Sequence, residues 1–241
     1  MSVTIVILQP MFIPWLGLFE QIRLSDIYVH YDDVQLPQGR SFTTRVQIKT
    51  SAGITWLTAP VDRTHSGAMI NETCLVQDNN WRIKHLKSLK QWYARAPFVD
   101  TMMEIANQIY AFDSNNLALF NLHAIELVTA WLGLKTRFSS SSELGIAGSS
   151  TRRLVDICQY YKADTYVTGL GALHYLDYEQ FESYGISVRY MDYEKRTYPQ
   201  LHGTFTPFVS ILDTIANCGR KTEELIRSGA IYWKDFLLRG Q

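Results

Sequence analysis

The chain has 241 residues, of which 46% are apolar, a composition typical of a folded globular protein and unlike that of a disordered chain. Lys and Arg total 23 and Asp and Glu total 23, so the formal charge is zero. The basic excess that phosphate contacts require is absent, and we expect no nucleic-acid partner.

The cysteines and the apolar start of the chain exclude two further classes. Cys74, Cys158 and Cys218 lie far apart and form no C-x-x-C unit, so neither a disulfide framework nor a zinc site is expected. Residues 3–19 are largely apolar, but no basic segment precedes them and two prolines would interrupt a membrane-spanning helix. We expect a cytoplasmic protein that is not bound to a membrane.

The first part of the chain predicts strand, helix and strand. A β-branched apolar run over residues 3–8 predicts a strand covered on both faces, followed by a proline-containing loop over 9–17. A short helix is expected over 18–24 and a second, parallel strand over 27–31. Two strands at 45–49 and 55–61, joined by turn residues, predict a hairpin that extends this α/β unit.

A helical middle and a second alternating part follow. Helices are expected from Asn80 to Pro97, near 98–111 and near 114–133. Strands then fall near 136–140, 165–168 and 186–191, with helices over 151–161 and 178–184. Thr206 and Pro207 predict the start of a helix that ends at Gly219, and a last helix covers 221–228.

This order of elements predicts an α/β fold. We expect a mostly parallel sheet with crossover helices, a β-hairpin extension and a helical middle insertion at roughly 80–134. No repeat or flexible linker divides the chain, so a single domain over residues 1–241 is predicted.

Ligands in open α/β sheets bind beyond the carboxyl ends of the strands, which singles out specific loops. The loop after the first predicted strand contains Gln9, Pro14, Trp15 and Gly17. Amides at the start of the next helix can hold a phosphate, although a rigid apolar turn explains the loop equally well. The loop lacks the glycine patterns of dinucleotide-binding and P-loop proteins.

Polar residues follow two other predicted strands. Asp32, Asp33 and Gln35 follow the second strand, where one carboxylate can act as a base or bind a ligand hydroxyl while the other caps the turn. Ser141 belongs to a serine run after the strand near 136–140, which can bind an anion or form a plain polar loop. The run 149–153 (Ser-Ser-Thr-Arg-Arg) is similar to the phosphate loop of nucleotidyltransferases, and helix capping explains it as well.

Two more segments carry candidate residues. Residues 198–207 are aromatic and proline-rich, as in an ordered lid or pocket wall, and His202 is the histidine best placed for acid–base chemistry. In the next helix Ser210, Asp213 and Asn217 share one face, which either meets solvent or lines a pocket where Asp213 orients a ligand. A basic helix face over 81–90 can supply cations for a pyrophosphate or simply face solvent.

The chain resembles the WbqC-like protein family over nearly its whole length. The resemblance rests on the order and spacing of short stretches: Gln9-Pro10-x-x-x-Pro14-Trp15-x-Gly17, Ser25-Asp26, Tyr31-Asp32-Asp33-Val34-Gln35, Trp81 with His85, Ser141-Ser142-Glu143-Leu144, Tyr198-Pro199-Gln200, Phe205-x-Pro207, Ser210-Ile211, Asp213 and Asn217-x-Gly219. Where the family has an arginine-containing run before the hairpin, this chain keeps Arg45 alone, a candidate for anion binding.

The resemblance implies a role in bacterial surface-polysaccharide and O-antigen biosynthesis, with a nucleotide-linked sugar as the small-molecule substrate. Our leading hypothesis is an acyl- or aminoacyl-type transferase acting on a nucleotide-linked amino sugar. Asp32, Asp33 or His202 would then serve as the base on the incoming amine. The alternatives are a nucleotidyltransferase-like or adenylate-forming enzyme, and a non-catalytic binding or scaffold protein of the same pathway. No cofactor is identified, and a homo-oligomer is compatible with the sequence.

Overall fold

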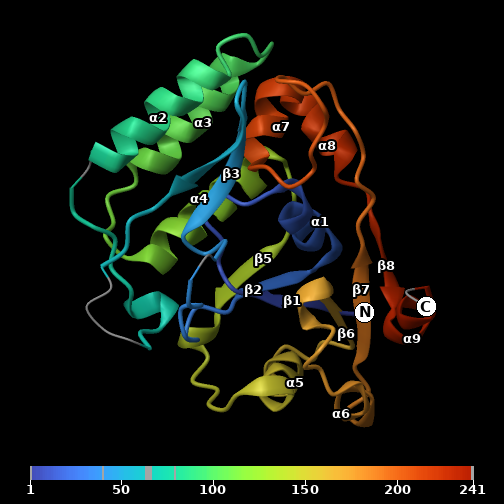
Figure 1. The fold of residues 1–241 in the computed structure, drawn as a ribbon. Coiled ribbons are helices and arrows are strands. Elements are labelled where there is room, and N and C mark those ends of the chain that lie inside the picture. Colours follow the sequence, from blue (N-terminus) through green and yellow to red (C-terminus); the bar gives the residue numbers. More distant parts are fainter. Residues whose placement is uncertain (1, 40, 63–66, 79, 240–241) are drawn as a thin grey trace.

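A mostly parallel sheet forms the centre of the protein. The computed structural model describes residues 2–39, 41–62, 67–78 and 80–239. Its main sheet has the strand order β5-β2-β1-β6-β7-β8 (Figure 1). The strands are β1 (Thr4–Leu8), β2 (Ile27–His30), β5 (Arg137–Ser140), β6 (Thr165–Thr168), β7 (Ser187–Asp192) and β8 (Gly229–Tyr232). Neighbours are parallel except β7 and β8, which are antiparallel.

Alternating side chains along the strands give the sheet two cores. Val6 of β1 faces one core, whereas Ile5 and Ile7 face the other, as the two-residue period of a strand requires. The first core holds residues of α1 (Leu16–Leu24), α2 (Asn80–Trp92), α3 (Val99–Ala111), α4 (Leu117–Trp131) and α7 (Ile211–Cys218). The second holds residues of α5 (Ser150–Tyr160), α6 (Tyr178–Ser183) and α9 (Trp233–Arg239).

The predicted hairpin is a separate two-stranded sheet of β3 (Arg45–Thr50) and β4 (Gly53–Thr58). Its apolar side chains Val46, Ile48 and Leu57 belong to the first core, so the hairpin is part of that layer. In Figure 1 it lies beside α2 and α3. The three helices α2, α3 and α4 form the expected helical insertion between β4 and β5, and the predicted α/β fold class is confirmed.

The position of β1 opens a crevice in the sheet. The chain builds β2 and β5 on one side of β1 and then β6 and β7 on the other, which makes the gap between β1 and β6 a topological switch point. β1 pairs with β2 as far as Leu8, but its register with β6 includes only Thr4 and Ile5. The two strands therefore part toward their carboxyl ends.

Two predictions about the last third of the chain are wrong. The helix expected at Thr206 and Pro207 begins only after Ser210, whose hydroxyl accepts a hydrogen bond from the Leu212 amide (3.3 Å) and caps α7. The residues before it form a loop because the Ser210 segment pairs with Trp15 at the start of α1.

The helix expected over 221–228 is also wrong. It is only the short α8 (Thr222–Leu225), and the chain then adds β8 to the sheet and ends in α9. The periodicity of so short a strand is ambiguous, and its pairing with β7 depends on residues distant in sequence. Within the described residues no helix is long and apolar enough to cross a membrane.

We predict that Gly219→Ala is more destabilising than Gly133→Ala, although both residues follow a helix with positive φ (55° and 70°). A Cβ at Gly219 would lie 2.7 Å from the Phe98 ring, whereas a Cβ at Gly133 would meet nothing within 4 Å. Positive φ costs alanine about 1–2 kcal/mol in the left-handed helical region. Gly219 has ψ −135°, outside that region, so its backbone strain is at least as large, and overpacking adds about 1–3 kcal/mol there alone. Urea unfolding of both variants measures the difference, and equal losses would contradict the packing argument.

Candidate functional site

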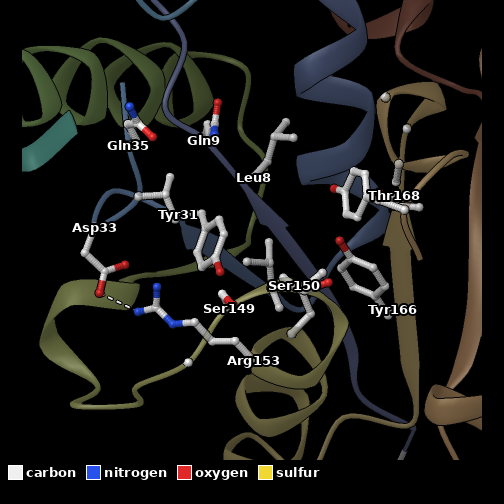
Figure 2. A pocket seen from close by; sticks show the side chains of 18 of the residues that line it. Leu8, Gln9, Tyr31, Asp33, Gln35, Ser149, Ser150, Arg153, Tyr166 and Thr168 are labelled. Carbon is white, nitrogen blue, oxygen red and sulfur yellow. Dashed lines mark hydrogen bonds and ion pairs between the residues drawn. The ribbon is translucent and has the colours of Figure 1, made fainter. Parts of the chain in front are cut away.

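A cavity of about 630 Å³ lies at the carboxyl ends of β1, β2 and β6 (Figure 2). We call it the switch-point cavity. Its polar lining comes from Gln9 after β1, Tyr31, Asp33 and Gln35 after β2, Ser149, Ser150 and Arg153 at the start of α5, and Tyr166, Thr168 and Tyr175 around the end of β6. Its volume is in the range of small-molecule sites.

An ion pair forms one wall of this cavity. The Arg153 guanidinium contacts the Asp33 carboxylate, donates to the Ile146 carbonyl (2.9 Å) and lies 5.0 Å from the centre of the Tyr31 ring. Burial lowers the pKa of Arg153, but the hydrogen bonds and charges of Asp33 and Tyr31 outweigh it and raise the pKa overall. The cation is thus fixed in direction, with the Asp33 side chain 26% exposed.

Asp32 plays a different part from its neighbour. Its carboxylate accepts hydrogen bonds from the Ser142 amide (3.0 Å), the Ser142 hydroxyl (2.7 Å) and the Ser141 hydroxyl (3.2 Å). Ser141 also contacts Asp33. The two adjacent carboxylates therefore tie the end of β2 to the serine loop after β5, and Asp33 is the one that lines the cavity.

The start of α5 also borders the cavity. Gly148, Ser149 and Ser150 line it, and Gly148 (φ 114°) and Ser150 (φ 56°) adopt left-handed backbone conformations at this turn. The Ser149 side chain makes no capping hydrogen bond to the described part of α5. First-turn amides carry a partial positive charge that attracts anions.

Other polar side chains line the cavity across from the ion pair. Figure 2 shows Tyr166 and Thr168 opposite Asp33 and Arg153, with Gln9 and Gln35 along another edge. Burial raises the pKa values of Tyr31, Tyr166 and Tyr175, so these phenols stay neutral at physiological pH and act as hydrogen-bonding groups. A cation, a helix start, amides and phenols together suit an anionic, hydroxyl-rich ligand.

Of the predicted site residues, the structure brings together Gln9, Asp32, Asp33, Gln35 and Ser141 at this end of the sheet. The other residues of the first loop lie elsewhere. Pro14 accepts a hydrogen bond from the Ile211 amide (2.8 Å). Trp15 lines a neighbouring cavity, and a Cβ at Gly17 would lie 2.3 Å from its indole, so the glycine lets the ring fold back over α1.

A second group of predicted residues forms a closed network. Asp213 is fully buried and accepts hydrogen bonds from Tyr93 (2.8 Å), Tyr198 (2.7 Å) and Gln200 (2.8 Å). The pKa of Asp213 is raised overall, because the effect of burial exceeds the opposing effects of the hydrogen bonds from Tyr198, Gln200 and Tyr93 and of the Lys49 charge. Asn217 donates to the Asp213 carbonyl (2.8 Å).

Lys49 connects this network to the hairpin. Its ammonium donates to the Gln200 side chain (2.9 Å) and to the carbonyls of Gly203 (3.1 Å) and Thr204 (2.7 Å). His202 in the same loop bonds the Trp92 carbonyl (2.7 Å). The network therefore joins β3, α7 and the 198–207 loop, away from the residues that line the switch-point cavity.

The remaining predicted residues lie in other contacts. Arg45 stacks on Trp56 of the hairpin at 3.9 Å from the ring centre. His85 is buried among aromatic rings, with Nδ1 3.0 Å from the Tyr110 hydroxyl. On the same basic helix, Arg82 donates to the carbonyls of Tyr110 and Phe112.

Several lining residues were outside the predicted set. Tyr166, Thr168, Gly169 and Tyr175 follow or belong to β6, and the rule of carboxyl strand ends, applied to that strand as well, would have found them. Lys49 carried no such signal, because a lysine in a hairpin strand is usually exposed and its burial depends on the distant 198–207 loop.

The similarity to known proteins covers most of the chain. The pattern of the WbqC-like protein family matches residues 9–224. A relative, uncharacterized protein Rv1507c of Mycobacterium tuberculosis, is 35% identical over 228 residues, which cover 92% of this chain and 97% of the relative. No solved structure matches the chain.

We predict that His85 makes the protein sensitive to acid. Burial lowers the pKa of His85 from 6.5 to about 4, so between these values the unfolded chain binds a proton that the folded protein excludes. The contribution of His85 to the free energy of unfolding is fully present above pH 6.5. It falls by roughly 3 kcal/mol as the pH drops to about 4. His85→Gln should flatten this slope in urea unfolding at several pH values. His174→Gln, at an exposed histidine, is the control, and an unchanged slope in His85→Gln would contradict the assignment.

Proposed function

We propose, because the chain belongs to the WbqC-like protein family, that it is an enzyme of bacterial surface-polysaccharide biosynthesis that transfers an acyl or aminoacyl group to a nucleotide-linked amino sugar. The observation that carries the proposal is the switch-point cavity, where Arg153 and the start of α5 border the same space. A fixed guanidinium and helix amides are a combination suited to phosphate oxygens.

The sugar would occupy the polar part of the cavity. The amides of Gln9 and Gln35 and the phenols of Tyr31 and Tyr166 offer both donors and acceptors to hydroxyl groups. Among these groups Tyr166 is buried, and a buried polar group favours a substrate that satisfies it over one that does not. The cavity volume of about 630 Å³ accommodates a sugar and its phosphates.

Asp33 is the best placed of the three proposed bases, since it lines this cavity whereas Asp32 is held by Ser142 and His202 lies beside Trp92. In the proposed reaction the amine nitrogen of the sugar attacks the carbonyl carbon of an activated acyl donor such as a thioester. The carbon–sulfur bond breaks, Asp33 accepts the amine proton, and that proton passes to the departing thiolate. Arg153 would hold the substrate phosphate and the Asp33 carboxylate in fixed positions.

A second candidate is a nucleotidyltransferase-like or adenylate-forming enzyme. It draws support from Ser149, Ser150 and Arg153, whose serine-and-arginine run borders the cavity. The transferase and the nucleotidyltransferase-like or adenylate-forming enzyme require different nucleotides. Thermal stabilisation by UDP- or dTDP-linked sugars or acyl-CoA supports the transferase, and stabilisation by ATP or CTP alone, with pyrophosphate release, supports the alternative. Binding of a nucleotide-linked sugar without turnover supports a scaffold role.

We predict that Arg153→Lys weakens binding of UDP- and dTDP-linked sugars by about tenfold or more, because a charge-assisted hydrogen bond contributes about 1.5–3 kcal/mol. Lysine keeps the charge that balances Asp33 but loses the planar fork. Isothermal titration calorimetry measures the change. The neighbouring Arg152→Lys is the matched control, since Arg152 is half-exposed and pairs with Asp156. Equal affinities in the two variants would remove Arg153 from the site.

We predict that Asp33→Asn, which keeps an oxygen acceptor for Arg153 but cannot accept the proton, lowers turnover by at least about a hundredfold, the usual contribution of a general base. The protein should still fold and bind the nucleotide-linked sugar, as circular dichroism and calorimetry can establish. His202→Ala, assayed alongside, tests the other proposed base. Unchanged turnover in both variants would rule out these two residues as bases.

A further inference from the structure

A second cavity, of about 480 Å³, adjoins the switch-point cavity. The two share four lining residues: Leu8, Met11, Gly169 and Gly171. Both open at the carboxyl ends of β1 and β6, so one ligand can extend from the first cavity into the second. Whereas the first is bordered by an ion pair, the second is mostly apolar, and we call it the ring pocket.

Four aromatic rings line the ring pocket: Trp15, Tyr193, Phe208 and Phe236. Trp15 lies edge-on to Tyr193 with ring centres 4.9 Å apart, and at 5.4 Å from the Phe208 ring. Phe208 is 43% exposed, and the Lys195 ammonium lies 5.4 Å from the centre of its ring. Exposed aromatic faces at the mouth of a cavity suit a flat ligand that stacks on them.

The lining also holds polar side chains, of which Asp192, Tyr193 and Lys195 are partly or fully exposed and Gln21 is buried. Gln21 of α1 lines the ring pocket and is 5% exposed. Its Oε1 has no hydrogen-bond partner among the described residues. The amide sits against the backbone, because a Cβ at Gly169 would lie 2.8 Å from its Nε2. A buried carbonyl oxygen without a donor is costly, so its presence points to a ligand that supplies one.

The chemistry of the occupant follows from these two features. An acyl chain would fill the apolar volume but leave the Gln21 oxygen unpaired. A nucleobase has both a flat face for the rings and N–H groups on its edge for the amide. We propose that the ring pocket binds the nucleobase of the nucleotide-linked sugar, with Gln21 bonded to the edge of the base. This proposal rests on the proposed function, in which the phosphates and sugar occupy the switch-point cavity.

The test uses Gln21→Met, which keeps the volume of the side chain and removes both hydrogen-bonding groups. We expect about tenfold weaker binding of UDP-glucose or dTDP-glucose in calorimetry, the loss of one hydrogen bond to a ligand. Binding of glucose 1-phosphate should not change. The melting temperature of the free protein should be equal or higher, because an unpaired buried amide oxygen has been removed. Gln159→Met, on the exposed face of α5, is the control.

A second variant, Phe208→Ala, removes a half-exposed ring with little risk to the fold, and should weaken binding of free uridine or thymidine. Unchanged nucleotide-sugar affinity in both variants would overturn the proposal while leaving the switch-point cavity as a sugar-phosphate site. Tighter binding of octanoyl-CoA by Gln21→Met, without loss of nucleotide-sugar affinity, would assign the pocket to an acyl chain. If uridine or thymidine binds and no nucleotide-linked sugar does, the base pocket is supported and the proposed function fails.

Discussion

Strand β1 must satisfy its backbone on both edges and its side chains on both faces, and the rest of the molecule is arranged around that requirement. β2 pairs with it as far as Leu8, while β6 pairs only with Thr4 and Ile5. Helices cover both faces, so the carboxyl end is the part of the strand left open. The divergence of β1 and β6 creates a crevice there, and both cavities open into it.

Two aspartates show how surroundings decide what a carboxylate can do. Asp213 is enclosed by Tyr93, Tyr198 and Gln200, which hold the hairpin, α7 and the 198–207 loop together. Asp33 is held by Arg153 and Ser141 and still faces a cavity. The first arrangement stabilises the packing of these elements, because removing any donor would leave a buried charge or dipole unpaired. The second leaves a polar group accessible to a ligand.

The fold class was predictable from sequence because strands covered on both faces read as apolar runs and the helices have marked periodicity. The polar residues after β1 and β2 were found by the same reasoning, since carboxyl ends of parallel strands meet at one edge. The role of Arg153 could not be predicted, because its pairing with Asp33 joins distant parts of the chain. In the sequence it was one residue of an ambiguous serine-and-arginine run. Asp213 and Asn217 lie one turn apart on α7 as expected, whereas Ser210 caps that helix. Only the packing of Tyr93 and Tyr198 against Asp213 decides that this face is closed. The terminal strand β8 depends on pairing with β7 and has almost no local signal.

The last helix of the chain contributes to the ring pocket and not to the switch-point cavity. Phe236 of α9 forms part of its wall, and α9 lies beyond residue 224, where the family pattern stops. β8 lies at the edge of the sheet, and Trp233 and Phe236 of α9 pack against the second core. The wall of one cavity thus depends on an element at the edge of the sheet, whereas the other is built from loops at its centre.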